Sequence, residues 1–339
     1  MNAVSTSSVA DDRSTLACLI GELEQREALD NQDSVVSLSN VRATPGTTLI
    51  VPGLNGEYVV TEHARNQLGR LLGLSWDRFF RNATSHDRAE ELNRRLARAE
   101  GVVKVRSAKR PQGGCDIEAA GVIKAFVSPT YTPIADSAVA NVIREALVEV
   151  EPEPRLVRTD ITELTASYVV RLGQPFRVGR DGTVGDVWGG LVVKNSGVGF
   201  SCLSVSLHLT RIACTNGLVL PLPDASLVRW VHRSLDIGRI RERIVAGLDG
   251  VAGKIHRGAE LLEASTRHRI HDAEREIRDV LRQARLPLGL VSDIVEAYRK
   301  EPNQSRFGIS QALTLAAQRV TPEVRHDLER AAGVYVAQG

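Results

Sequence analysis

The chain has 339 residues, 42% of them hydrophobic, which is enough to bury a sizeable core and excludes a disordered tail or a small disulfide-stapled domain. Its formal net charge is only +2, so a strongly basic or acidic chain is excluded as well. No run of about 18 apolar residues and no signal-peptide pattern is present, so we expect a soluble, cytoplasmic protein without membrane contact.

The four cysteines, Cys18, Cys115, Cys202 and Cys214, match neither a zinc-binding spacing nor a dense disulfide framework. We therefore expect reduced thiols. The eight histidines form no recognised metal-ligand set, and no phosphate-binding loop is visible. The sequence thus predicts no metal site, no cofactor and no catalytic set.

The N-terminal region is rich in Ser, Asp and Asn around one plausible helix, Ser14 to Leu29, and ends at the Pro45-Gly46 break. We expect residues 1–45 to be a loosely ordered segment. Beyond it, apolar residues between Ala64 and Leu72 recur at helical spacing. Thr84-Ser-His-Asp87 has the form of a capping box and predicts the start of another helix.

Residues 101–223 change to a β pattern. β-Branched residues separated by Gly, Pro and Asn predict strands over 102–106, 121–127, 166–172 and 191–194. One helix, Asp136 to Val150, interrupts them. This layout favours an α+β fold with a central antiparallel sheet and an inserted helix, forming a core domain over residues 46–224.

The region 225–339 reads as a long C-terminal helical region. One apolar stripe runs from Ile237 to Leu262, and a second runs from Ile270 to Ala284, before Pro287. Thr321-Pro322 has the N-cap and first-turn residues that open a last helix.

The segment Ser201–Thr210 alternates strictly between apolar and polar residues, which predicts a half-buried strand with His208 on its polar, solvent-facing side. Arg211 then falls on the apolar side. Either the strand ends or bulges at this point, or the guanidinium is buried against a partner, in the protein or in a nucleic acid.

Cys214, Asn216 and Gly217 follow in the stretch Cys-Thr-Asn-Gly-Leu. Asn-Gly between apolar segments is a strong signal for a tight turn. A catalytic cysteine would need a cation or an imidazole beside it, and neither Arg211 nor His208 is fixed there by the sequence. We interpret the three residues as a structural motif.

Basic residues on the predicted sheet suggest a different activity. They alternate with apolar residues or follow a strand directly, so they could form a row of positive charge along a solvent-exposed sheet face that would suit a phosphate backbone. An ordinary solvated sheet face explains them equally well. The candidate nucleic-acid contacts are Lys104, Arg106, Lys109, Arg110, Lys124, Lys194 and Arg211, with Tyr131, Tyr168, Trp188 and Phe200 as candidates for base stacking.

Four blocks resemble a phage- and plasmid-like protein family that is catalogued as a domain of unknown function. Its pattern is roughly N-S-x-x-G, followed by R-x-x-C-T-N-G-L, and the matching residues here are Asn195–Ser201 and Arg211–Leu218. Phe126–Ile134 resembles its S-x-x-Y-x-P-I block. Phe307–Thr314 resembles a late W-G-x-x-N-A-x-T block, in which Phe307 and Gln311 replace the usual Trp and Asn.

The resemblance implies a protein of a phage, plasmid or other mobile element. The fold is also similar in its expected order of elements to the single-strand annealing proteins of the RecT and Redβ type. That similarity implies binding of single-stranded DNA during recombination or replication, assembly into a homo-oligomeric ring or filament, and no nucleotide cofactor.

Two functional hypotheses therefore stand at the level of sequence. The first, which we favour, is an oligomeric single-stranded DNA-binding and annealing protein that is not an enzyme. The second is an enzyme that uses Cys214 together with Arg211 and His208. A non-enzymatic interaction or inhibitor protein is a third reading, because a surface patch leaves no sequence motif.

Overall fold

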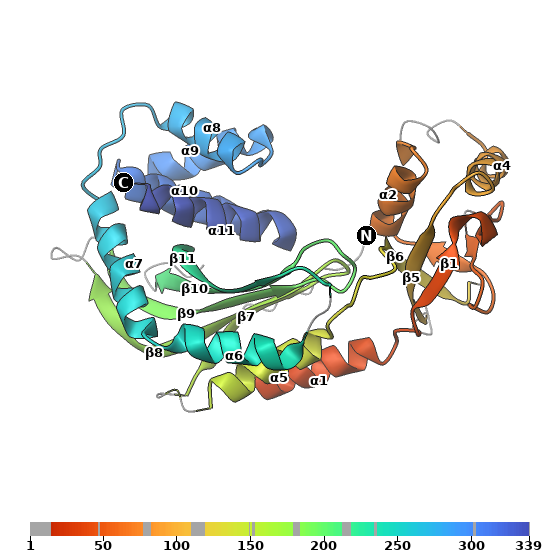
Figure 1. Ribbon diagram of the computed structural model, residues 1–339. Coiled ribbons are helices and arrows are strands. Elements are labelled where there is room, and N and C mark those ends of the chain that lie inside the picture. The colour runs from red at the N-terminus through yellow and green to blue at the C-terminus, as the bar shows by residue number, and fades with distance from the viewer. Residues whose placement is uncertain are drawn as a thin grey trace.

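The computed structural model describes residues 15–46, 48–76, 83–109, 119–148, 150, 153–178, 184–211, 218–233, 236–300 and 303–338, with backbone only for 211 and 218–225. The α+β class predicted from the sequence is confirmed. Two separate sheets make up the β structure rather than one (Figure 1). None of the helices in the described ranges is long and apolar enough to cross a membrane.

The first sheet has six strands in the order β1-β5-β6-β4-β3-β2, with β4 parallel to β6 and the other pairs antiparallel. Two helices, α2 (Glu62–Leu71) and α4 (Ser85–Leu96), and the short 3-10 helix η1 (Leu38–Asn40) complete its core. The strands are β1 (Ser34–Ser37), β2 (Arg42–Ala43), β3 (Leu49–Ile50), β4 (Tyr58–Val60), β5 (Val102–Lys109) and β6 (Gly121–Val127).

The second sheet is a five-stranded antiparallel meander in the order β11-β10-β9-β8-β7. A meander forms because consecutive strands are joined by short connections and so pair with their neighbours in sequence. The strands are β7 (Arg155–Ile161), β8 (Ala166–Val178), β9 (Gly185–Asn195), β10 (Leu203–Arg211) and β11 (Leu218–Trp230).

One face of the second sheet packs on helices from three parts of the chain: α1 (Leu16–Glu27), α5 (Asp136–Ala146) and α6 (Ile237–Leu248). Leu203, Val205 and Leu207 point into this core, as the alternation of β10 predicts. Figure 1 shows the three helices lying side by side beneath the sheet.

The C-terminal helices cover the opposite face. Helix α11 contacts β11 and is ion-paired to β7, so it reaches both edge strands of the curled second sheet (Figure 1). The helices of the C-terminal region after α6 are α7 (Val251–Ser265), α8 (Ala273–Gln283), the 3-10 helix η2 (Leu288–Leu290), α9 (Val291–Lys300), α10 (Arg306–Ala317) and α11 (Pro322–Ala337).

Three expectations about the organisation of the chain need correction. The described part of the N-terminal segment is not loosely attached, because α1 is buried in the second core, with Leu23 at 0% exposure, and β1 pairs with β5. The expected boundary at residues 224–225 falls inside β11. The stripe from Ile237 to Leu262 is two helices, broken before Gly250, whose φ of +67° favours glycine.

Candidate functional site

Three of the predicted phosphate-binding cations lie at the junction between the two sheets, where each is bound by the protein itself. Lys124 Nζ lies 2.7 Å from Asp30 Oδ1. Arg106 Nε lies 3.0 Å from Asp33 Oδ1, and its Nη2 lies 3.5 Å from the second oxygen of Asp30. Lys104 donates to the carbonyl oxygen of Tyr131. Their charges are therefore neutralised or engaged before any ligand arrives.

The same junction holds the Asn195–Phe200 loop between β9 and β10, which contains the N-S-x-x-G block. Arg106 Nη1 donates to the carbonyl of Gly197, and Gln67 Nε2 donates to that of Val198 at 3.1 Å. The Tyr131 hydroxyl donates to the carbonyl of Ser196 at 2.7 Å and accepts from the Gly199 amide at 3.1 Å. The loop is thus clamped from the first sheet.

These contacts correct the predicted row of charge on a solvent-exposed face. Alternate residues of β5, such as Lys104 and Arg106, do share a face, but that face lies against the junction, and the side chain of Arg106 is only 12% exposed. Lys109 is exposed at the end of β5. Arg110 lies outside the described residues.

Lys194 is also buried, at 6% exposure, on the face of the second sheet that α11 covers. Burial lowers the pKa of its ammonium group, which Asp327 and Glu323 of α11 partly offset. Lys194 is thus not available to a phosphate backbone either.

Helix α11 meets this sheet face through a network of four charges. Arg158 on β7 is bound by both carboxylate oxygens of Glu329, with Nη2 and Oε2 at 2.8 Å. Asp160 lies 3.2 Å from Arg158 Nε and 2.9 Å from Arg325 Nη1. Glu329 is 2% exposed and Arg325 is 8% exposed, so the four groups balance each other inside the protein.

The prediction that His208 faces solvent is wrong, whereas Ser204, Ser206 and Thr210 on the same side of β10 are half-buried. His208 is 0% exposed, and its Nδ1 lies 3.2 Å from the Thr210 hydroxyl. Burial, reinforced by the nearby Arg158, lowers the pKa of His208 to about 3. A ring sealed in this way is not positioned to activate a thiol for a substrate, which removes one described partner from the Cys214 hypothesis.

Arg211 and Leu218, the first and last residues of the R-x-x-C-T-N-G-L block, lie opposite each other on β10 and β11. Strand β10 ends at Arg211, which pairs with Leu218 on β11 and Val187 on β9. The alternation predicts either that the strand ends or bulges at Arg211 or that its guanidinium group is buried, and the strand does end there. Cys214, Asn216 and Gly217, with the predicted turn, lie outside the described residues, as does the side chain of Arg211.

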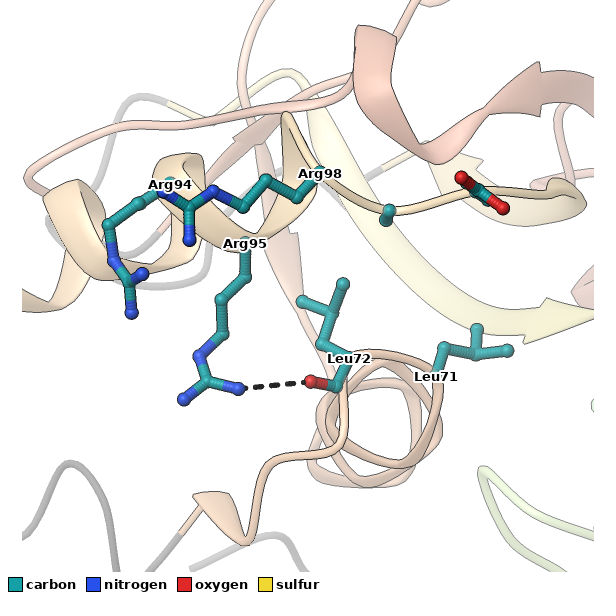
Figure 2. A pocket seen from close by; sticks show the side chains of 7 residues that line it. Leu71, Leu72, Arg94, Arg95 and Arg98 are labelled. Carbon is teal, nitrogen blue, oxygen red and sulfur yellow. Dashed lines mark hydrogen bonds between the residues drawn. The ribbon is translucent and has the colours of Figure 1, made fainter.

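A shallow pocket of about 530 Å³ opens between the ends of α2 and α4 and is lined by three arginines (Figure 2). Arg95 Nη1 donates to the carbonyl of Leu72, the C-cap residue of α2, at 3.2 Å. Arg94 and Arg95 both bind Glu91, whose pKa they lower to about 2.

Arg98 and Glu100 complete the polar lining of this pocket. Two helix C-termini meet there, and each carries a partial negative charge of about half a unit. Together with Glu91 and Glu100 they offset the three guanidinium groups, so we assign the arginines to helix capping rather than to anion binding.

A different cluster, with two cations, lies on β7, β8 and β9 of the second sheet. Arg155 on β7 is directly opposite Arg171 on β8. The Arg171 guanidinium carbon lies 3.7 Å from the ring centroid of Trp188 on β9. Arg155 is exposed, and the other two are half-buried. We refer to Arg155, Arg171 and Trp188 as the Arg-Trp cluster.

The electrostatics of the Arg-Trp cluster are unfavourable without a ligand. Like charges directly opposite each other on neighbouring strands are destabilising. Burial and, secondly, the charge of Arg155 lower the pKa of Arg171. Within the described part of the chain neither arginine forms a salt bridge with a carboxylate. The arrangement favours an anion that contacts both guanidinium groups.

The sequence contains a partial signal for the Arg-Trp cluster. Trp188 is among the aromatic residues expected to stack on bases, whereas Arg155 and Arg171 are not among the expected cations. Their opposition depends on the register of β7 and β8, which includes a shift between Leu156 and Arg158. Sequence alternation alone does not reveal that register.

No known family model, curated protein or solved structure matches this chain. Over the described ranges, no group of three or more His, Cys, Asp or Glu residues is arranged to hold a metal ion.

Proposed function

We propose that the protein binds single-stranded DNA through the Arg-Trp cluster, and that it does so as an oligomeric annealing protein of a phage, plasmid or other mobile element. The proposal rests on one observation: Arg155 lies directly opposite Arg171, and among the described residues neither has a carboxylate partner. The resemblance of the sequence blocks to mobile-element proteins supports the biological setting.

Phosphate is the anion that suits this arrangement. A guanidinium group presents a planar fork of donors that binds two phosphate oxygens at once. Two such forks on adjacent β-strands can contact successive phosphates of one DNA strand. An aromatic ring beside cationic groups is typical of surfaces that bind single strands, where bases stack and the backbone follows the positive charge.

The proposal is tested by fluorescence anisotropy with a labelled oligonucleotide of about 20 nucleotides, at low and at moderate salt. Arg155→Gln/Arg171→Gln should weaken binding and lower the slope of log K against log salt by about 1.4, since each phosphate contact on a single strand contributes about 0.7. A matched control is Arg278→Gln/Arg282→Gln on α8, where both arginines are paired with acidic residues of the same helix.

Absence of binding by the wild-type protein at low salt would overturn the proposal, and so would binding that does not depend on salt. Equal losses in the test and control variants would show that only net charge matters. The oligomeric part of the proposal has its own measurement. Mass photometry with and without the oligonucleotide should show assemblies larger than one chain.

A further inference from the structure

Phe200 is the exposed end of the clamped Asn195–Phe200 loop. Its side chain is 43% exposed, although aromatic residues of this size are usually buried. Val231, which follows the last residue of β11, is 65% exposed. The chain therefore presents apolar surface to solvent at the junction between the two sheets.

The loop that carries Phe200 is held firmly in place. Its carbonyls are bound by Arg106, Gln67 and Tyr131, and its Ser196 hydroxyl accepts from the Phe200 amide at 3.0 Å. Gly199 has a φ of +74°, a conformation that favours glycine and directs the chain into Phe200. An aromatic ring on a fixed backbone loses little entropy when a ligand packs on it.

One aromatic contact orients the Phe200 ring. The His63 ring meets it edge-to-face, with centroids 5.8 Å apart and an interplanar angle of 67°. His63 is itself fixed by a hydrogen bond between its Nε2 and the Val198 carbonyl oxygen at 3.1 Å. The geometry thus orients the Phe200 ring without covering it completely.

Two arginines lie at and just after the end of β11. Arg229 and Arg233 are exposed, and within the described ranges neither has a salt bridge. Arg233 follows His232, whose ring stacks on Tyr131 with centroids 5.1 Å apart, and the Tyr131 hydroxyl binds the residue before Phe200. Arg233 and Phe200 therefore flank the same tyrosine.

We propose that Phe200 is a stacking platform for one unpaired base, with Arg233 contacting the adjacent phosphate. This inference rests on the proposed function and specifies its substrate class as nucleic acid with unstacked bases. A duplex is excluded from the platform, because its bases are already stacked and paired within the helix.

The platform is separate from the Arg-Trp cluster. Asn195 lies seven residues after Trp188 along β9, which corresponds to about 24 Å at the usual rise of a strand. Sites this far apart contribute to binding nearly independently. Losses from Phe200→Ala and from Arg171→Gln should therefore add when the two substitutions are combined.

The test compares three variants of the full-length chain. Phe200→Ala removes the ring. Phe200→Leu keeps an apolar side chain without a π face, and Phe200→Trp provides a larger aromatic ring. Val157→Ala is a matched control, because Val157 on β7 is also 43% exposed. Each variant is titrated with single-stranded 20-mer thymidine oligonucleotide, the same length of duplex, and an abasic 20-mer that has phosphates but no bases.

Phe200→Ala and Phe200→Leu should lose about fivefold to 100-fold in affinity for the thymidine oligonucleotide, because stacking on one aromatic ring is typically lost on this scale. Phe200→Trp should retain affinity, and its added fluorescence should be quenched by the bound base. Affinity for the abasic strand should be the same in all variants.

Equal affinity of Phe200→Ala and wild type for the thymidine oligonucleotide would overturn this inference alone. A loss for the abasic strand that matches the loss for the thymidine strand would also overturn it, since the ring would then act on the loop rather than on a base. If the wild-type protein bound no oligonucleotide at low salt, both this inference and the proposed function would fall.

Discussion

Arg106 shows how one side chain connects the two halves of the molecule. It binds Asp30 and Asp33, which precede β1, and it donates to Gly197 in the loop after β9. A guanidinium group suits this position because its five donors lie in one plane and it stays charged when it is partly buried. Lysine has the same charge but only a single, compact donor group.

Arg106→Met should lower the free energy of unfolding by about 2 kcal/mol, because Asp33 and the Gly197 carbonyl lose this donor and Asp30 keeps only Lys124. Urea denaturation followed by circular dichroism measures the change. The control is Arg94→Met, whose side chain is 49% exposed and pairs only within α4. If both variants lost the same stability, the junction would not depend on the Arg106 contacts.

At this scale the sequence predicts which side chains are charged but not what they contact. The alternation of β5 places Lys104 and Arg106 on one face, and the structure agrees. The partners of Arg106 come from residues far away in the chain, and such pairings follow from tertiary packing. This is why a row of cations that suits DNA in the sequence is a set of internal contacts in the structure.

At the scale of elements, α11 lies on a polar sheet face as well as on an apolar core. Leu328 and Ala332 pack into the core beneath α7 to α10, while Arg325 and Glu329 point to β7. The charged side chains lie four residues apart, and so do Leu328 and Ala332, so the helix presents one charged and one apolar stripe. The arrangement fixes the position of α11 along the sheet, because each charge has a specific partner.

Glu329→Gln should lower the free energy of unfolding by about 3 kcal/mol, since Arg158 and Arg325 would then share the single carboxylate of Asp160. Thermal and urea unfolding measure this loss. Glu296→Gln provides the control, because Glu296 pairs with Lys300 on the exposed surface of α9 and should leave stability nearly unchanged. A stable Glu329→Gln variant would show that the network is dispensable.

Local signals predict the elements well where they depend on nearby residues. The capping box at Thr84 and Asp87 is present, and the last helix begins with Pro322 after Thr321. Strand β6 has the bounds that its β-branched residues predict. The break at Gly250 was missed because the apolar stripe continues through it, and glycine within a helical pattern is often tolerated.

At the scale of the whole molecule, acid stability depends on groups that the two layers bury. His208 is neutral in the folded chain because its pKa is about 3, whereas it titrates near 6.5 when unfolded. Its contribution is complete above pH 6.5 and is lost as the pH falls towards 3, because the unfolded chain then binds a proton that the folded chain does not.

The wild-type protein should therefore lose about 2 kcal/mol of stability between pH 7 and pH 5 from this residue alone. Denaturation curves at half-unit intervals of pH measure the slope. His208→Gln should make the slope shallower without abolishing it, since burial also lowers the pKa of His326 on α11 to about 3. His256→Gln, which removes an exposed histidine of α7, should leave the slope unchanged. An unchanged slope in His208→Gln would place the acid sensitivity elsewhere.

The division into two sheets could not be predicted from the pattern of strands. All strands after residue 101 have similar composition, and their assignment to one sheet or the other depends on pairing across long distances. The expected α+β class depends only on the proportion and order of elements, so it is confirmed while the number of sheets is wrong.

The path of the N-terminal segment has a consequence for how the molecule could be divided. Helix α1 belongs to the core of the second sheet, and β1, seven residues later, is an edge strand of the first. A cut near residue 150 would thus separate the second sheet from α1 and α5, two of the three helices that pack on one of its faces. Neither fragment should fold alone, but the two expressed together should reassociate, with α1 and α5 as the parts that bind the second sheet.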